Sequence, residues 1–158
     1  MLQYTTTVGE KGLRNGNLVN CQLVAGSRVG YMPIPKVLYI EDRPDNRLLV
    51  RRVLLVEGME VLEADNAEQG IALARSERPD LILMDINMPG TDGYTATNDI
   101  RQIPELDHIP VVALTANVMK GDKERSLDAG CDGYIPKPID IDRFPIDIMN
   151  WIQRGRRK

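Results

Sequence analysis

The chain has 158 residues, of which 42% are hydrophobic and 27% are charged, and its formal net charge at pH 7 is −3. This length suits one domain of ordinary size, and the composition is that of a globular protein rather than a disordered one. No apolar run reaches the roughly 18 residues that a membrane-spanning helix requires, so we expect no insertion into a membrane. The mixed composition of the N-terminus also argues against a secretory signal.

The charge is distributed unevenly along the chain. Residues 1–35 carry +2 and residues 154–158 carry +4, which leaves −9 for residues 36–153. An acidic body lacks the clustered Lys and Arg with which proteins bind nucleic acid, so we expect no nucleic-acid partner. We interpret the basic C-terminus as a solvated helix end, placed favourably against the helix dipole.

The few cysteines and the single histidine exclude several kinds of site. Cys21 and Cys131 form no CxxC pair, which argues against a thiolate zinc site and against a thioredoxin-like motif. We expect both thiols to be reduced, as in a cytoplasmic protein. His108 is the only histidine, so a metal site built from several imidazoles is excluded, and we interpret it as a surface-loop side chain rather than a phosphohistidine.

Residues 1–35 show no helical or strand periodicity over a useful length, apart from a short strand expected around Leu18–Val24. Glycines interrupt this segment every few residues, so we expect a flexible N-terminal extension. Three origins stay open for it: an upstream linker, an added leader, or a start codon read too early ahead of Met32.

A regular alternation of strands and helices begins at Lys36. The apolar stretches that predict strands are 37–40, 59–64, 81–84, 111–114 and 133–135. The expected helices are one that stops at Gly58, one that starts at the Asn66–Gln69 capping box, 92–102, 120–129, and one that begins near Asp142.

Three of these strands are apolar without alternation, as strands buried on both faces are. Each connection between strands is long enough for a right-handed crossover. The pattern therefore predicts an α/β fold: a doubly wound, five-stranded parallel sheet with helices on both sides, as a single domain over residues 36–153. Residues 154–158 form the basic tail.

Ligands of an open parallel sheet bind outside the carboxyl ends of its strands. Four of the five strands deliver polar groups there, namely Glu41 with Asp42, Asp85, Thr115 and Lys137. Strand ends are commonly exposed to solvent and polar, which explains one or two such groups but not this whole set.

The set has a common chemistry. Converging carboxylates raise one another's pKa values unless a cation neutralises them, and all-oxygen ligands suit Mg²⁺ with retained waters. A hydroxyl and an ammonium beside them would stabilise a phosphoryl group held on a carboxylate. No Walker A, GxGxxG or GxSxG motif offers a competing chemistry.

The residues around these groups match a known family. The pair Glu41–Asp42, LILMDINMPGTDGY around Asp85, VVALTAN around Thr115 and GYIPKP around Lys137 resemble the receiver domain of two-component response regulators. The successive separations of 43, 30 and 22 residues agree with that family, whose fold is flavodoxin-like. The stretch VVALTANVMKGDKER is most similar to the stand-alone CheY-like and DivK-like regulators or to the receiver of a hybrid histidine kinase.

The resemblance implies roles for the residues that would handle the phosphoryl group. Asp85 would be the phosphoacceptor, Thr115 would bind the phosphoryl group, and Lys137 would pair with it. Tyr134 would be the aromatic switch that turns inward when Thr115 moves, and a cis peptide bond would precede Pro138.

The resemblance also implies a Mg²⁺ site. Asp42 and Asp85 would ligate the ion directly, Glu41 would do so through water, and Asn87 would contribute its backbone carbonyl. The Glu-Asp pair replaces the Asp-Asp pair of many members, which lengthens one acid by a methylene.

The leading hypothesis is therefore a phosphorylation-activated switch of a two-component phosphorelay. A histidine kinase or histidine phosphotransfer protein would supply the phosphoryl group, and a downstream protein target would read the altered surface. The domain would not be an enzyme beyond its own phosphorylation and dephosphorylation, and it would be cytoplasmic. It would be either a stand-alone protein or a piece of a larger kinase.

Two other functions remain as alternatives. A receiver fold used only as a constitutive scaffold usually lacks one of the acids, the threonine or the lysine, and all of them are present here. A small phosphatase or flavodoxin-like carrier would need a phosphate-binding loop, which is missing.

Overall fold

The structure is a computed structural model that describes residues 10–14, 17–21, 33–116 and 122–156. The chain divides into two compact units, Met1–Ile34 and Pro35–Lys158. Among the described residues, no helix combines the length and the apolar character needed to cross a bilayer.

The first unit contains an antiparallel pair of strands, β1 (Glu10–Arg14) and β2 (Asn17–Cys21). The strand expected around Leu18–Val24 overlaps β2, and its last three residues lie outside the described part of the chain. The strand β1 was not predicted. Its sequence, EKGLR, has little β-propensity of its own, so its extended form depends on pairing with β2.

The second unit confirms the expected α/β fold, with five parallel strands in the order β4-β3-β5-β6-β7. The strands are β3 (Lys36–Ile40), β4 (Glu60–Ala64), β5 (Leu81–Asp85), β6 (Val111–Thr115) and β7 (Gly133–Pro136). The helices are α1 (Pro44–Val56), α2 (Ala67–Glu77), α3 (Gly93–Arg101), α4 (Asp122–Asp128) and α5 (Phe144–Arg154).

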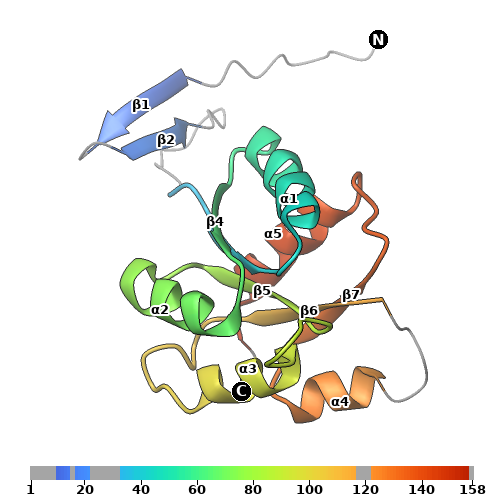
Figure 1. The fold of residues 1–158 in the computed structure, drawn as a ribbon. Coiled ribbons are helices and arrows are strands. Elements are labelled where there is room, and N and C mark those ends of the chain that lie inside the picture. The colour runs from blue at the N-terminus through green and yellow to red at the C-terminus, as the bar shows by residue number, and fades with distance from the viewer. Residues whose placement is uncertain (1–9, 15–16, 22–32, 117–121, 157–158) are drawn as a thin grey trace. The chain divides into compact units, whose positions relative to one another are not determined.

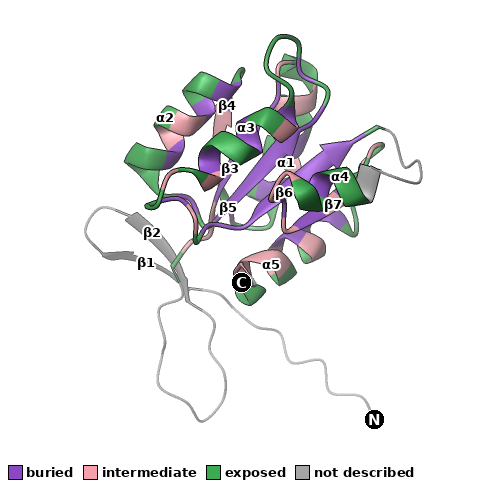
Figure 2. Ribbon diagram, turned by 90° about the horizontal axis from the view of Figure 1, so that it is seen from below, coloured by how far each residue is buried: buried purple, intermediate pink, exposed green. Residues whose placement is uncertain are grey.

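The sheet separates two apolar cores. Helices α1 and α5 cover one face and α2, α3 and α4 cover the other (Figure 1). Side chains of β3, β5 and β6 alternate between the two cores, so these strands are buried along their whole length after the first residue of β3 (Figure 2). This burial on both faces is the physical reason that their sequences show no alternation.

Side chains cap the N-termini of α2 and α3, and the first residue of α5 differs from the expected one. Asn66 caps α2 by accepting from the backbone N–H of Gln69, as expected, and Asp92 caps α3 in the same way. The helix α5 begins at Phe144 rather than near Asp142, with Pro145 in its first turn. For α4, the expected start at residue 120 lies outside the described residues.

The basic C-terminus is partly engaged in ion pairs, so its interpretation as a simple solvated helix end is wrong for Arg156. Its guanidinium pairs with Asp107 and lies 3.6 Å from Asp132 Oδ1. The buried Arg101 pairs with Asp132 at 2.7 Å and donates to the backbone carbonyls of Gly130 and Ile109. These contacts join the end of α3 to the segments that precede β6 and β7.

Two other sequence interpretations concern single residues. His108 is exposed in a turn before β6, as expected of a surface-loop histidine. Cys131 is a free, buried thiol whose pKa is raised by burial to about 11.

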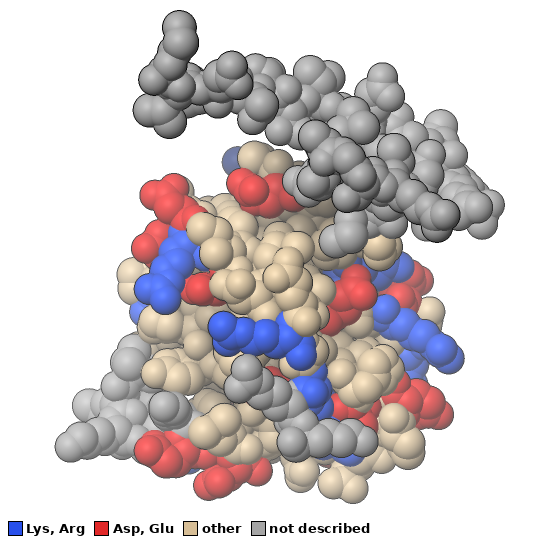
Figure 3. Space-filling model, turned by 180° about the vertical axis from the view of Figure 1, so that it is seen from behind, with Lys and Arg blue, Asp and Glu red and all other residues tan. Residues whose placement is uncertain are grey.

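Acidic and basic side chains are interspersed on the face that Figure 3 shows, so no patch of one sign dominates it.

Candidate functional site

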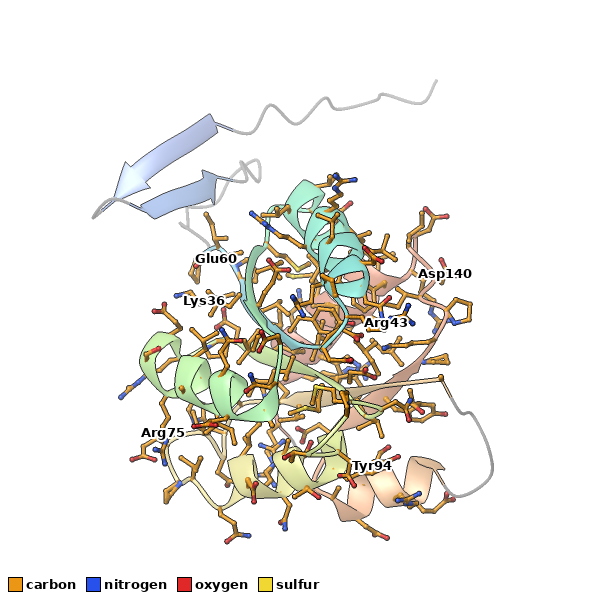
Figure 4. The ribbon with its side chains drawn as sticks, in the orientation of Figure 1. Lys36, Arg43, Glu60, Arg75, Tyr94 and Asp140 are labelled. Carbon is orange, nitrogen blue, oxygen red and sulfur yellow. The ribbon has the colours of Figure 1, made fainter. Side chains whose placement is uncertain are left out.

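Four neighbouring strands deliver the predicted site residues to one edge of the sheet. Because β3, β5, β6 and β7 are adjacent and parallel, the residues that follow or end them meet at their shared carboxyl edge. Lys36 marks the opposite end of β3 and Arg43 lies just past its carboxyl end, on the same side as Asp140 (Figure 4). The structure thus brings the acids and the lysine together.

Lys137 lies between two carboxylates. Its Nζ is 2.8 Å from Glu41 Oε2 and 3.0 Å from Asp85 Oδ1. The backbone N–H of Lys137 donates to the carbonyl of Thr115 at 2.8 Å, and the peptide bond to Pro138 is cis, as expected. The contact places the ammonium beside the expected phosphoacceptor, whereas the pairing with Glu41 was not predicted.

The Glu41 carboxylate is completely buried and receives several hydrogen bonds. Besides Lys137, Tyr39 OH donates to Oε2 at 2.7 Å and Asn46 Nδ2 donates to it at 3.0 Å. The backbone N–H of Arg43 donates to Oε1 at 3.2 Å. Burial by itself would raise the pKa of Glu41, but these donors outweigh it and lower the pKa to about 2.

Asp85 is also buried, but its pKa shifts in the opposite direction. Burial raises it, the nearby charge of Glu41 adds to the rise, and the contact with Lys137 opposes it only in part. The backbone N–H of Asn87 donates to Asp85 Oδ1 at 3.3 Å. Lys137 lowers the pKa of both acids, but only Glu41 also receives hydrogen bonds from Tyr39 and Asn46.

The acids form a cluster that suits a divalent cation. One carboxylate oxygen from each of Glu41, Asp42 and Asp85 lies within 4.8 Å of the other two. Asp42 is half-buried and is therefore the acid most open to solvent. All the donors are oxygens, which is the ligand set that Mg²⁺ prefers, so the residues present fit this ion.

The expected switch residues lie beside this cluster. Thr115 ends β6 and is 3% exposed, and Tyr134 is half-buried in β7. The Tyr134 side chain packs against the apolar core on the α2 and α3 face. In the register of the two strands, Thr115 faces Pro136 and Tyr134 faces Ala113, so the two switch residues lie on neighbouring strands.

Sequence reasoning missed two polar contributors to the site. Tyr39 was interpreted only as part of an apolar strand, and Asn46 was not singled out. Strand geometry offered a signal for Tyr39, because side chains two residues apart point to the same face and Glu41 is two residues on. No comparable pattern pointed to Asn46.

Comparison with known proteins supports the same chemistry. Residues 37–148 match the family described as the response regulator receiver domain. The chain is 42% identical over 120 residues to the polar-differentiation response regulator DivK of Brucella anthropi, covering 75% of this chain and 98% of that protein. It is 40% identical over 116 residues to DivK of Brucella ovis, covering 73% and 94%.

Solved structures with the same fold include a receiver domain of a histidine kinase and a chemotaxis protein. One is the receiver domain of the sensor histidine kinase PA1611 from Pseudomonas aeruginosa, with a magnesium ion coordinated in its active site cleft. It has a TM-score of 0.70 and 34% identity, covering 76% of this chain and 98% of that one. The chemotaxis protein CheY4 of Vibrio cholerae has a TM-score of 0.71 and 26% identity, covering 74% and 98%.

Proposed function

The chain belongs to the family of response regulator receiver domains, and we propose that Asp85 is the phosphoacceptor through which it works as a two-component signalling switch. The single observation that supports this assignment is the position of Asp85, buried between the other two acids and the Lys137 ammonium at the carboxyl edge of the sheet. A carboxylate in that position can contact a cation held by the acids. The Lys137 ammonium can stabilise the negative charge of an attached phosphoryl group.

We propose that the phosphoryl donor is a histidine kinase or a histidine phosphotransfer protein. An Asp85 carboxylate oxygen attacks the phosphorus of the donor's phosphohistidine. The P–N bond breaks, its electron pair returns to the imidazole nitrogen, and a P–O bond to Asp85 forms. In this proposal the domain promotes only its own phosphorylation and dephosphorylation, and it acts in the cytoplasm.

Mg²⁺ would be held by Asp42 and Asp85, with Glu41 acting through water and Asn87 through its backbone carbonyl. When bound, the ion would neutralise charge on the phosphoryl oxygens. The chain's own groups supply the rest: Thr115 would donate its hydroxyl to a phosphoryl oxygen, and Lys137 would transfer part of its pairing from Asp85 to the new group.

The switch follows from the added charge. The phosphoryl group carries about −1.5 to −2 at neutral pH, in place of the single negative charge of the carboxylate, and brings new hydrogen-bond acceptors. In this proposal Thr115 moves toward the phosphoryl group, Tyr134 turns inward, and the surface formed by α4, β7 and α5 changes. The downstream protein target binds that surface, so phosphorylation shifts a population between two states that already exist.

The test is the mass of the intact protein after incubation with acetyl phosphate and Mg²⁺. The parent chain should gain one phosphoryl group, and Asp85→Asn should gain none, because an amide cannot form the acyl phosphate. Asp99→Asn makes the same chemical change at an exposed position of α3 and serves as the control. If Asp85→Asn gains the group at the parent's rate, the acceptor lies elsewhere, and a parent that gains none would favour a scaffold.

A further inference from the structure

Tyr39 is a buried tyrosine whose hydroxyl contacts the acidic cluster from inside the protein. Its side chain is 0% exposed, and its ring packs in the apolar core on the α1 and α5 face. The hydroxyl donates to Glu41 Oε2 at 2.7 Å. A buried tyrosine needs a hydrogen-bond partner, but this partner is one of the three acids that face the cation site.

The oxygen that Tyr39 contacts is the same one that holds Lys137. Tyr39 OH, Asn46 Nδ2 and Lys137 Nζ all donate to Glu41 Oε2, at 2.7, 3.0 and 2.8 Å. The other oxygen of Glu41 accepts from the Arg43 backbone N–H. The carboxylate therefore cannot rotate without losing several of these bonds, and its orientation is set by the surrounding groups.

A continuous chain of polar contacts results. It runs from Tyr39 through Glu41 and Lys137 to Asp85, with separations of 2.7, 2.8 and 3.0 Å. Tyr39 is the end of this chain that lies inside the apolar core, where close packing holds its ring in one place. Glu41 in turn limits where the Lys137 ammonium can lie relative to Asp85.

We propose that Tyr39 is a positioning residue of this site. Its hydroxyl fixes the Glu41 carboxylate in the orientation that holds Lys137 beside Asp85 and presents Glu41 to a bound Mg²⁺ ion. The inference rests on the proposed function, because it concerns the same acids and the same ion. It adds a residue that touches neither the phosphoryl group nor the cation.

The test is Tyr39→Phe, which removes the hydroxyl and keeps the ring. Outer hydrogen-bond partners of metal ligands typically change metal affinity by 10–100-fold. Because Asn46 and the Arg43 N–H still contact Glu41, we expect the lower limit, about a tenfold weaker Mg²⁺ affinity. An NMR titration with MgCl₂, followed at the backbone amide of Asn87, measures it without any phosphorylation.

A double-mutant comparison shows whether Tyr39 acts through Glu41. In a Glu41→Gln background, Tyr39→Phe should cause no further loss of Mg²⁺ affinity, because the carboxylate it positions is gone. A role in core packing alone would leave the Mg²⁺ affinity of Tyr39→Phe equal to that of the parent, and that result would overturn the proposal. An equal further loss in the Glu41→Gln background would overturn it as well.

A second measurement uses the unaltered chain, in case Tyr39→Phe does not fold. The ring carbon resonances of Tyr39 should shift during the Mg²⁺ titration with the same midpoint as the Asn87 amide. A Tyr39 signal that stays constant while Asn87 saturates would refute the positioning role alone. A parent chain in which neither signal responds to Mg²⁺ would instead refute the metal site of the proposed function.

Discussion

At the scale of single residues, two carboxylates share one positive charge but differ in their other hydrogen bonds. Lys137 contacts both Glu41 and Asp85, yet the pKa of Glu41 is lowered to about 2 and the pKa of Asp85 is raised. The difference arises because Glu41 also receives hydrogen bonds from Tyr39 and Asn46. Glu41 is thus kept ionised, while the negative charge of Asp85 is compensated less completely, and a bound cation would stabilise it.

Asp42 offers a direct test of the metal site. Asp42→Ala should abolish measurable Mg²⁺ binding, and the variant should melt at the same temperature as the parent or higher in the absence of metal. Removing one of three neighbouring carboxylates relieves their repulsion, and Asp42 has no ion pair among the described residues that would be lost. Calorimetric titration and thermal unfolding measure the two effects. A melting temperature several degrees lower with Mg²⁺ binding retained would contradict both.

Glu41 should contribute a pH-dependent part of the stability. Its pKa in the folded state, about 2, lies below the ordinary value of 4.5. The folded state therefore binds its proton less readily than the unfolded state, so this contribution is complete above about pH 4.5 and is lost as the pH falls toward 2. Glu41→Gln should accordingly melt below the parent at pH 6, and the two melting curves should converge near pH 2. A difference that stays constant across this range would show that Glu41 is not the titrating group.

At the scale of elements, the residue at which each strand ends determines where its functional group lies. Close packing of the helices against the sheet keeps the strands in register. One such contact joins β7 to α5. A Cβ atom added at Gly133 would lie 2.2 Å from Trp151 Cζ2, so the indole ring rests directly on the backbone of β7. This strand leads into Lys137, and the position of the lysine therefore depends on the packing of α5.

Gly133→Ala should disturb this packing. Overfilling a packed core costs roughly 1–3 kcal/mol, and we expect about 2 kcal/mol of lost stability together with a red shift of the Trp151 emission, because the ring must move toward solvent. The chain has one tryptophan, so the signal is unambiguous. Gly90→Ala is the control: its φ of +87° strains an alanine, but a Cβ there meets no atom within 4 Å. An unchanged emission in Gly133→Ala would show that the contact is not tight.

The extent to which sequence predicted these features differs between the sheet and its surroundings. The uninterrupted apolar runs of β3, β5 and β6 and the cap at Asn66 are local signals, and the sequence predicted each of them correctly. The strand β1 has no such signal, because its extended form depends on a partner strand. The helix α5 begins two residues after Asp142, because Asp142 lies in a turn in which its backbone N–H donates to Asp140 Oδ1.

The residues of the site also divide into those that a local sequence pattern indicated and those whose contacts depend on the folded chain. The strand-end rule, applied to the predicted sheet, and the family motifs pointed to the acids, the threonine and the lysine. The contacts of Tyr39 and Asn46 with Glu41 depend on rotamers and on the start of α1, which a linear pattern does not encode. The pairing of Arg156 with Asp107 was missed for the same reason, because the two residues are distant in sequence.

At the scale of the whole molecule, we propose that Lys137 couples phosphorylation at the carboxyl edge of the sheet to the surface formed by α4, β7 and α5. Its side chain contacts Glu41 and Asp85, and its backbone N–H donates a hydrogen bond to the carbonyl of Thr115. Lys137→Ala should therefore still accept some phosphoryl group but fail to transmit it. In the phosphorylated variant, the Tyr134 resonances should stay within a small fraction of the shift that the parent shows.

The comparison for this prediction uses Lys36→Ala. Lys36 forms ion pairs with Glu60 and Glu77 at the opposite end of the sheet, so its loss should leave both phosphorylation and the Tyr134 shift unchanged. NMR spectra with and without acetyl phosphate give the readout for each variant. A full Tyr134 shift in phosphorylated Lys137→Ala would mean that another residue couples the site to the surface.

The order of the strands also determines when the site can exist during synthesis. The chain leaves β3, adds β4 at one edge, and then returns across β3 to lay down β5, β6 and β7 in turn. The acids are therefore made long before the ammonium that compensates Glu41 and Asp85, since Lys137 follows the last strand. A nascent chain that still lacks β7 would carry the acidic cluster without its cationic partner and without the switch residue Tyr134. Because β7 and Lys137 come last, we expect a phosphorylation-dependent change of surface only from a chain whose synthesis has passed both.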